Sequence, residues 1–253
     1  MKDKPVILYW IRRDLRISDN PALIEAVNSG ALVVPVFIYD EWFSELGAAP
    51  KFRLEKSLLS LQKQYEKLGS YLLIKKGPAG SVLQDLIKAT HATSVFWARD
   101  LDPKAIARDS KIKKDLKARG ISVKSFRGQV LFEPWTVSTK TGGFYRVYTP
   151  FWNSVRVRNV ERSLKSPKSV SSPSLRPNSL SVGDLNLGKK MSRGRKILSQ
   201  YVEAGELAAQ TKLRNFLDGP VVSYSDDRNL PQINGTSLLS DHLAWGEISP
   251  NQC

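Results

Sequence analysis

The sequence predicts an α/β fold with a doubly wound, five-stranded parallel sheet, followed by a linker and the start of an all-α domain. Short apolar runs rich in Val, Ile and Phe alternate with helix-length amphipathic segments over the first 130 residues, which is the pattern of βα units. Each run is apolar enough to be covered on both faces, as strands of parallel sheets are. A stretch rich in Ser, Pro and Lys then separates this region from a second helical pattern.

Five strands are expected from the apolar runs. They cover residues 6–11, 33–39, 71–75, 94–98 and 121–125. Because a helix-length segment lies between each strand and the next, the sheet is expected to be parallel, with a ligand crevice outside the carboxyl ends of its strands.

Four helices fill the gaps between these strands. The first has Asp19 or Asn20 as its N-cap and Pro21 at its first helical position. The second carries an apolar stripe over residues 54–68 and ends at Gly69. The other two are expected to cover residues 81–90 and 103–119.

This periodicity is lost after Phe126. Residues 163–192 contain few large apolar side chains and are interpreted as a linker on the surface, although packing on the α/β domain could order them. A helical pattern returns over residues 196–216, and a further helix is expected near Ser237. The expected divisions are an α/β domain over residues 1–130, a connector over 131–195 and the start of a helical domain over 196–253.

The charge of the chain is strongly positive. The formal net charge is +15 and the pI is about 9.9. Basic residues are concentrated between residues 151 and 201, where only Glu161 and Asp184 oppose them. Such an excess attracts polyanions, so nucleic acid is the expected partner, and a basic surface that binds nothing is the alternative.

Several classes of site and location are disfavoured. The apolar run at residues 6–11 is too short for a signal sequence or a membrane span, so we expect a cytoplasmic protein that does not bind membranes. Cys253 is the single cysteine, and His91 and His242 stand far apart in the sequence, so no disulfide and no metal site are expected. The signature loops of hydrolases, P-loop NTPases and dinucleotide-dependent dehydrogenases do not occur.

Six short segments carry a more specific signal. They are WIRRDLR at residues 10–16, PVFIYD at 35–40, YTPFW at 148–152, YSDDRN at 224–229, GTSLLS at 235–240 and GEISP at 246–250. In order and spacing these segments resemble the photolyase/cryptochrome family of blue-light flavoproteins. Because they stay in register over nearly the whole chain, the sequence resembles the N-terminal half of a bacterial-type member of this family.

The segment at residues 235–240 has a physical meaning of its own. Its hydroxyl groups stand where a helix is expected to begin, and such a helix N-terminus can bind phosphate. An ordinary N-cap is the alternative. The resemblance implies a flavin adenine dinucleotide (FAD) site, with the diphosphate side of the cofactor held by Tyr224, Thr236, Ser237, Leu238, Leu239 and Ser240.

One basic residue is implied in DNA binding. By the resemblance, Arg228 lies on the rim that faces DNA and contacts a phosphate of the damaged strand. From the residues alone, a surface ion pair with Asp226 or Asp227 is the alternative.

The arginines after the first strand allow two interpretations. Arg12, Arg13 and Arg16 could line the pocket of an antenna chromophore at the crevice, or they could form ion pairs that fix the loop and dock the two domains, which we favour. Some family members that use folate carry an Asn-Glu pair after the fourth strand. The matching residues here are Lys104 and Ala105, so a folate antenna is not supported and the type of any antenna is unknown.

The resemblance implies light-driven repair of cyclobutane pyrimidine dimers in damaged DNA, through electron transfer from an excited reduced flavin. No catalytic side chain is then expected. A cryptochrome-type light sensor and a non-enzymatic α/β remnant that binds a chromophore or nothing are the alternatives. Members of the family are monomers considerably longer than 253 residues, so much of the flavin pocket is expected beyond Cys253, and the exposed helical part could make this chain associate.

Overall fold

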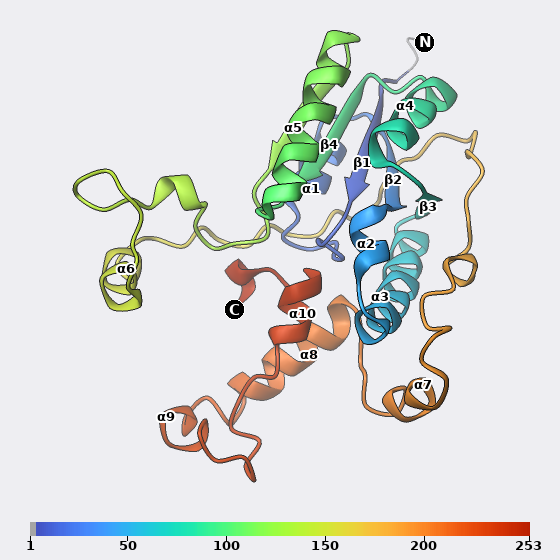
Figure 1. Cartoon of the computed structure of the whole chain (residues 1–253). Coiled ribbons are helices and arrows are strands. Elements are labelled where there is room, and N and C mark those ends of the chain that lie inside the picture. Colours follow the sequence, from blue (N-terminus) through green and yellow to red (C-terminus); the bar gives the residue numbers. More distant parts are fainter. Residues whose placement is uncertain (1–3) are drawn as a thin grey trace.

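The computed structural model describes residues 4–253, apart from the side chain of Ser192, and it contains a five-stranded parallel sheet (Figure 1). The strand order is β3-β2-β1-β4-β5, and every neighbouring pair is parallel. The strands are β1 (Val6–Ile11), β2 (Leu32–Tyr39), β3 (Leu73–Lys76), β4 (Ser94–Ala98) and β5 (Ser122–Phe126). The predicted doubly wound sheet is confirmed.

The helices between the strands also follow the prediction. They are α1 (Pro21–Asn28), α3 (Ala48–Lys67), α4 (Ala79–Thr90) and α5 (Pro103–Ala118). Asn20 caps α1 by accepting a hydrogen bond from the backbone N–H of Leu23 at 3.1 Å. A short helix that the pattern did not predict, α2 (Glu41–Glu45), follows β2 and is capped by Asp40. Its five residues are too few to show a helical period.

One edge strand differs from the expectation. The strand β5 was expected to be covered on both faces, but Lys124 is exposed and only Val123 is fully buried. The prediction was wrong here because β5 lies at the edge of the sheet. Charged side chains on an edge strand also disfavour pairing with another chain.

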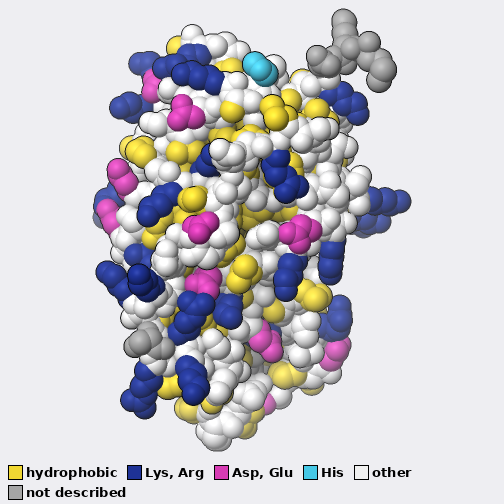
Figure 2. Space-filling view, turned by 90° about the vertical axis from the view of Figure 1, so that its right-hand side faces the viewer, with side chains coloured by type: hydrophobic (Ala, Val, Ile, Leu, Met, Phe, Trp, Pro, Cys, Tyr) yellow, Lys and Arg dark blue, Asp and Glu magenta, His cyan; other side chains and the backbone are white. Residues whose placement is uncertain are grey.

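The connector is packed more closely than a surface linker would be. Val170, Val182, Leu185 and Leu187 are between 1% and 6% exposed and belong to the hydrophobic core on one face of the sheet. Backbone hydrogen bonds join the connector to the α/β domain, for example from Val170 to Leu68 at 2.9 Å. The interpretation as a surface linker was wrong for these residues. The exposed remainder crosses a face on which Lys and Arg side chains are widely spread (Figure 2).

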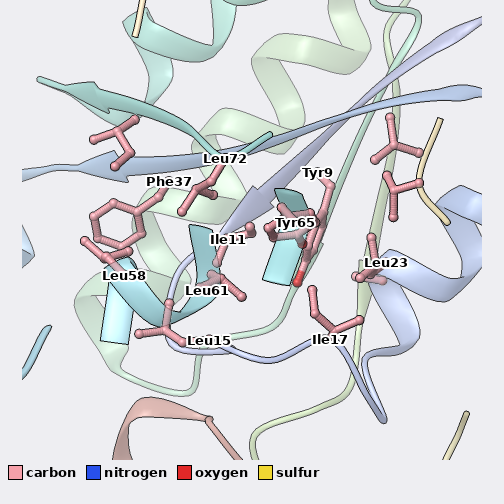
Figure 3. Packing of buried hydrophobic residues seen from close by; sticks show 14 of the residues in the cluster. Tyr9, Ile11, Leu15, Ile17, Leu23, Phe37, Leu58, Leu61, Tyr65 and Leu72 are labelled. Carbon is pink, nitrogen blue, oxygen red and sulfur yellow. The ribbon is translucent and has the colours of Figure 1, made fainter. Parts of the chain in front are cut away.

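Two hydrophobic clusters sandwich the sheet. Alternate strand residues point to α1 and α3 on one face and to α4 and α5 on the other. Figure 3 shows the first cluster, in which Tyr9 and Ile11 from β1 meet Leu61 and Tyr65 from α3. Tyr9 is fully buried and donates its hydroxyl hydrogen bond to Asp14. Burial, with the charge of Asp14 next in importance, raises the pKa of Tyr9 well above its usual value.

The helical part begins differently from the prediction. In place of one helix over residues 196–216, the chain forms α7 (Ser192–Leu198) and α8 (Glu206–Leu217). The break is at Gly205, which has φ +100° and lies so close to Ser60 that an added Cβ would be 2.0 Å from the hydroxyl oxygen. A continuous helix cannot include this backbone conformation.

The remaining helices are α6 (Tyr148–Val155), α9 (Tyr224–Asp227) and α10 (Ser240–Trp245). Residues 131–162, including α6, form an arm that extends away from the sheet (Figure 1). Large apolar side chains on it are exposed, among them Phe144 at 74%, Tyr148 at 70% and Trp152 at 46%. No helix within the described residues is both long enough and apolar enough to cross a bilayer.

Candidate functional site

The loop after β1 attaches the C-terminal part of the chain to the α/β domain. Arg16 is 1% exposed, and its guanidinium donates hydrogen bonds of 2.9 to 3.2 Å to the backbone carbonyls of Asp19, Gly128 and Gly246. One side chain thus ties together three segments that are far apart in sequence. The planar, permanently charged guanidinium suits this role because it presents five donors in a fixed geometry.

Neighbouring residues of the same loop make further contacts. Arg13 donates to the carbonyl of Ala244 at 3.2 Å, and the N–H of Leu15 donates to the carbonyl of Trp245 at 3.2 Å. Gly246 has φ +63°, and a Cβ there would be 2.0 Å from the carbonyl oxygen of Arg13. Arg13 and Arg16 thus fix the loop against the C-terminal segment through backbone carbonyls, and among the described residues they do not form the ion pairs that were expected.

Arg12 occupies a different environment, at the carboxyl end of β1. It forms an ion pair with Asp109 of α5, while the adjacent Arg108 pairs with Asp40 at 2.5 Å. The guanidinium carbons of Arg12 and Arg108 lie 4.8 and 5.0 Å from the ring centre of Trp10. Burial raises the pKa of Asp40, and the positive charge of Arg108 opposes this only in part.

A hollow of about 440 Å³ lies outside the carboxyl ends of the strands, between α2, the start of α4 and α5. It is lined among others by Asp40, Trp42, Gln84, Lys104, Ala105 and Arg108. Its walls come from both sides of the point where the strand order reverses between β1 and β4. This is the predicted location of a ligand crevice in a doubly wound fold.

Gly235, directly before the run expected to hold the FAD diphosphate, lies against the end of α9. An added Cβ at Gly235 would lie 2.6 Å from the Cβ of Asp227 and 3.0 Å from its backbone carbonyl carbon. The absence of a side chain at Gly235 therefore permits the close approach of this residue to the end of α9. Tyr224, at the first position of α9, packs edge-on against Phe216 of α8, with ring centres 5.8 Å apart.

The run from Thr236 to Ser240 exposes its polar groups. Within the described part of the chain, the hydroxyl groups of Thr236, Ser237 and Ser240 make no hydrogen bond, while Leu239 is buried at 4% exposure. Leu238 is 59% exposed and has φ +50°, a left-handed conformation that is strained for a bulky residue. The helix expected near Ser237 begins at Ser240, three residues later.

Arg228 is exposed at the end of α9. Its guanidinium carbon lies 5.8 Å from the ring centre of Tyr224. Asp227 instead accepts a hydrogen bond of 2.5 Å from Ser223, and neither Asp226 nor Asp227 pairs with Arg228 among the residues that the structure describes. The alternative of a surface ion pair is therefore not formed.

A buried polar cluster joins the C-terminal segment of the chain to α3. Glu247 is completely buried and accepts hydrogen bonds from Arg53 of α3 at 2.6 and 3.0 Å and from the N–H of Gly205 at 2.6 Å. His242 of α10 contacts the same carboxylate at 2.6 Å. Burial raises the pKa of Glu247, but the hydrogen bonds from His242 and Arg53 outweigh it, so that the pKa lies below its usual value. Sequence reasoning missed this cluster.

Glu206 is a second anchor that sequence reasoning missed. It is 5% exposed at the start of α8, and its carboxylate accepts hydrogen bonds from the backbone N–H groups of Ile17 at 2.8 Å and Ser18 at 2.9 Å. The one feature of the sequence that could have pointed to Glu206 is its position directly after Gly205. Its partners lie almost 190 residues earlier in the chain.

Comparison with known proteins yields a consistent set of matches. Residues 7–168 match the family model described as DNA photolyase. The chain is 41% identical over 251 residues to the deoxyribodipyrimidine photo-lyase of Agrobacterium fabrum, a match that covers 99% of this chain and 52% of that protein. It is 32% identical to cryptochrome-1 of Arabidopsis thaliana, covering 96% of this chain and 36% of that protein.

Solved structures give the same result. A bacterial class III photolyase from Agrobacterium tumefaciens superposes with a TM-score of 0.93 at 40% identity, over 99% of this chain and 52% of that one. An archaeal photolyase from Sulfolobus tokodaii, solved with two FAD molecules, superposes with a TM-score of 0.76 at 25% identity, over 98% of this chain and 53% of that one. The chain spans about half the length of the photolyases it matches.

Proposed function

This chain belongs to the DNA photolyase family, and on that premise we propose that it is the N-terminal part of a photolyase that repairs cyclobutane pyrimidine dimers in DNA with blue light. The observation that carries the proposal is the match to the Agrobacterium photolyases. It covers 99% of this chain in both sequence and backbone.

FAD is the proposed cofactor. The residues proposed for its diphosphate side are Tyr224, Thr236, Ser237, Leu238, Leu239 and Ser240. They fit this role because Gly235 permits the close approach of α9, and because the hydroxyl groups of the run have no partner in the described chain. The strained backbone of Leu238 agrees with a ligand-binding loop. When bound, the excited reduced flavin supplies the electron that splits the dimer.

Damaged DNA is the proposed substrate. Arg228 is proposed to contact a phosphate, and its exposure and the lack of an ion pair with Asp226 or Asp227 among the described residues support this role. The net charge of +15 favours association with a polyanion. We propose the cytoplasm as the location of the protein, because an enzyme of this kind acts in the compartment that holds the DNA.

The hollow at the carboxyl ends of the strands is proposed as the site of an antenna chromophore. Its volume of about 440 Å³ lies within the range of small-molecule sites. Lys104 and Ala105 line it, and they replace the Asn-Glu pair of some folate-using relatives.

A light sensor is the second candidate. The 32% identity with cryptochrome-1 of Arabidopsis thaliana, over 96% of this chain, supports it. The higher identity of 41% with a photolyase favours repair. A non-enzymatic α/β protein that binds a chromophore is the third candidate, and the hollow supports it.

A chimera tests the flavin site. Residues 1–253 of this chain would replace the matching part of the Agrobacterium fabrum photolyase, and the absorption spectrum would report bound flavin after purification. The chimera is expected to retain FAD. Replacing Thr236 and Ser240 with Ala removes two groups proposed to bind the charged diphosphate, so the dissociation constant is expected to rise roughly 10- to 100-fold.

The matched control changes two exposed hydroxyl residues elsewhere, Thr149→Ala with Ser166→Ala, and is expected to bind FAD as the unchanged chimera does. A chimera that folds but holds no flavin would contradict the proposed cofactor. Equal affinity of all three proteins would contradict the assignment of Thr236 and Ser240.

A further inference from the structure

A second hollow lies at the opposite edge of the α/β domain from β5. It occupies about 500 Å³ between the end of β3, the outer side of α4 and residues 175–178 of the connector. Its polar lining consists of Lys75, Lys76, Arg176, Asn178 and Asp85, over a floor of small and apolar side chains. We call this hollow the connector groove. Neither the flavin residues nor the antenna hollow contribute to it.

The walls of the connector groove are held by defined contacts. The backbone N–H of Leu180 donates to the carbonyl of Ile74 at 3.0 Å, and the hydroxyl of Ser179 accepts from the N–H of Ile74 at 2.9 Å. The connector thereby covers the edge strand β3. Arg176 lies over the ring of Tyr71 at 4.1 Å, which restricts where its guanidinium can point.

The charge of the connector groove is unbalanced. Within the described residues, Lys75, Lys76 and Arg176 form no ion pair, and Asp85 is the one acidic group in the lining. The surrounding face carries many more Lys and Arg side chains than Asp and Glu (Figure 2). Exposed basic residues of the connector continue the positive surface along the chain, namely Lys165, Lys168, Lys189, Lys190 and Arg193.

Such an arrangement suits phosphate groups. Lys and Arg donate charge-assisted hydrogen bonds to phosphate oxygens, and each neutralised phosphate releases counterions from nucleic acid. The three cations on its walls favour an anionic ligand over a neutral one. The continuation of the charge beyond the hollow favours an extended polyanion over a small anion.

We infer that the connector groove and the basic surface around it bind the phosphate backbone of duplex DNA, independently of Arg228. Arg228 directly follows α9, which is at the lower left of Figure 1, whereas β3, α4 and the connector are on the right. The two surfaces therefore engage different stretches of DNA. The inference rests on DNA being the partner in the proposed function, and it adds a contact that does not depend on base sequence or damage.

The test measures binding of an undamaged, fluorescein-labelled duplex to the 253-residue chain by fluorescence anisotropy, in the dark and without flavin. The variant K75Q/K76Q/R176Q removes the three cations of the connector groove. The control K114Q/K117Q/R119Q removes three exposed cations of α5 and its C-terminus, and so has the same net charge. Far-UV circular dichroism checks that both variants are folded.

Each phosphate contact contributes about 0.9 to the slope of log affinity against log salt concentration. The magnitude of this slope is therefore expected to fall by about 2 to 3 in the groove variant and by less than about 1 in the control. Near 0.1 M salt the groove variant is expected to bind at least roughly 10-fold more weakly than the unchanged chain. Equal losses in both variants would show that net charge alone acts and would overturn the inference. An unchanged groove variant would overturn it as well.

A competition arm separates the duplex from a small ligand. A mononucleotide added at the same phosphate concentration is expected to leave the duplex bound, because it cannot make several contacts at once. Displacement by the mononucleotide would identify a nucleotide pocket and would overturn the inference. Because no flavin, lesion or light is used, failure of flavin binding or repair in the chimera would leave this result unchanged.

Discussion

The buried carboxylate of Glu247 provides a direct test of how the C-terminal part is attached. In the variant Glu247→Gln the side chain keeps its size but loses the charge that Arg53 and His242 face. Arg53 is 7% exposed, so its guanidinium would be left inside the protein with a weaker set of partners. Asp241 remains at 3.3 Å, but its side chain is 46% exposed and screened by solvent.

The magnitude follows from these contacts. Removing one partner of a buried ion pair costs about 3–5 kcal/mol, and the remaining contact to Asp241 places the expected loss in the free energy of unfolding at about 2–4 kcal/mol. Urea denaturation followed by tryptophan fluorescence measures it, since Trp245 is buried beside the cluster. The control Glu161→Gln removes an ion pair with Arg127 whose acidic side chain is 69% exposed, and it is expected to cost less than about 1 kcal/mol.

The dependence on pH gives the same test a second readout. Because the pKa of Glu247 is lower in the folded protein than in the unfolded chain, its contribution to stability is present above the unfolded pKa of about 4 and is lost as the pH falls through the folded value. Stability of the unchanged chain should fall in that acidic range more steeply than stability of Glu247→Gln. Equal stability and equal pH profiles of the two proteins would refute the reasoning.

Three further predictions follow from other contacts. The variant Gly246→Ala would place a Cβ on a left-handed backbone and against the carbonyl of Arg13, so it should lower the free energy of unfolding, measured by urea denaturation, by about 2–4 kcal/mol. The control Gly219→Ala, whose added Cβ meets nothing within 4 Å, should change this free energy little. The exposed aromatic arm should make the chain self-associate, and Tyr148→Ser with Trp152→Ser should lower the sedimentation-average mass; an unchanged mass would count against this surface. Replacing Arg16 with Met should loosen the docked C-terminal segment and speed amide hydrogen exchange at Trp245 and Gly246, without comparable change in β2.

Much of the α/β domain could be predicted because its signals are local. The strand at residues 6–11 shows a buried apolar run, and Asn20 with Pro21 marks the start of a helix within two residues. The expected crevice follows from the strand order alone. The edge strand β5 was misjudged since its neighbours, not its composition, decide which faces are covered.

The candidate site was harder to predict than the α/β domain, because it depends on contacts between residues that are far apart in the sequence. Arg53 and Glu247 are 194 positions apart, and neither lies in a pattern that points to the other. Gly205 interrupts a helical pattern because it packs on Ser60 of α3, a contact that no window of local sequence contains. The residues proposed to bind flavin were identified through family resemblance, and the close approach of Gly235 to Asp227 is a contact that local sequence does not reveal.

The measurement that tests the central proposal most directly is repair by the chimera with the Agrobacterium fabrum photolyase. An oligonucleotide that contains one cyclobutane pyrimidine dimer would be incubated with the flavin-loaded chimera, in blue light and in the dark, and the remaining dimer would be quantified. We expect the dimer to be split only in light, and more slowly at limiting enzyme when Arg228 is replaced with Gln. A chimera that holds FAD and binds the oligonucleotide but leaves the dimer intact in light would contradict a repair function for this chain.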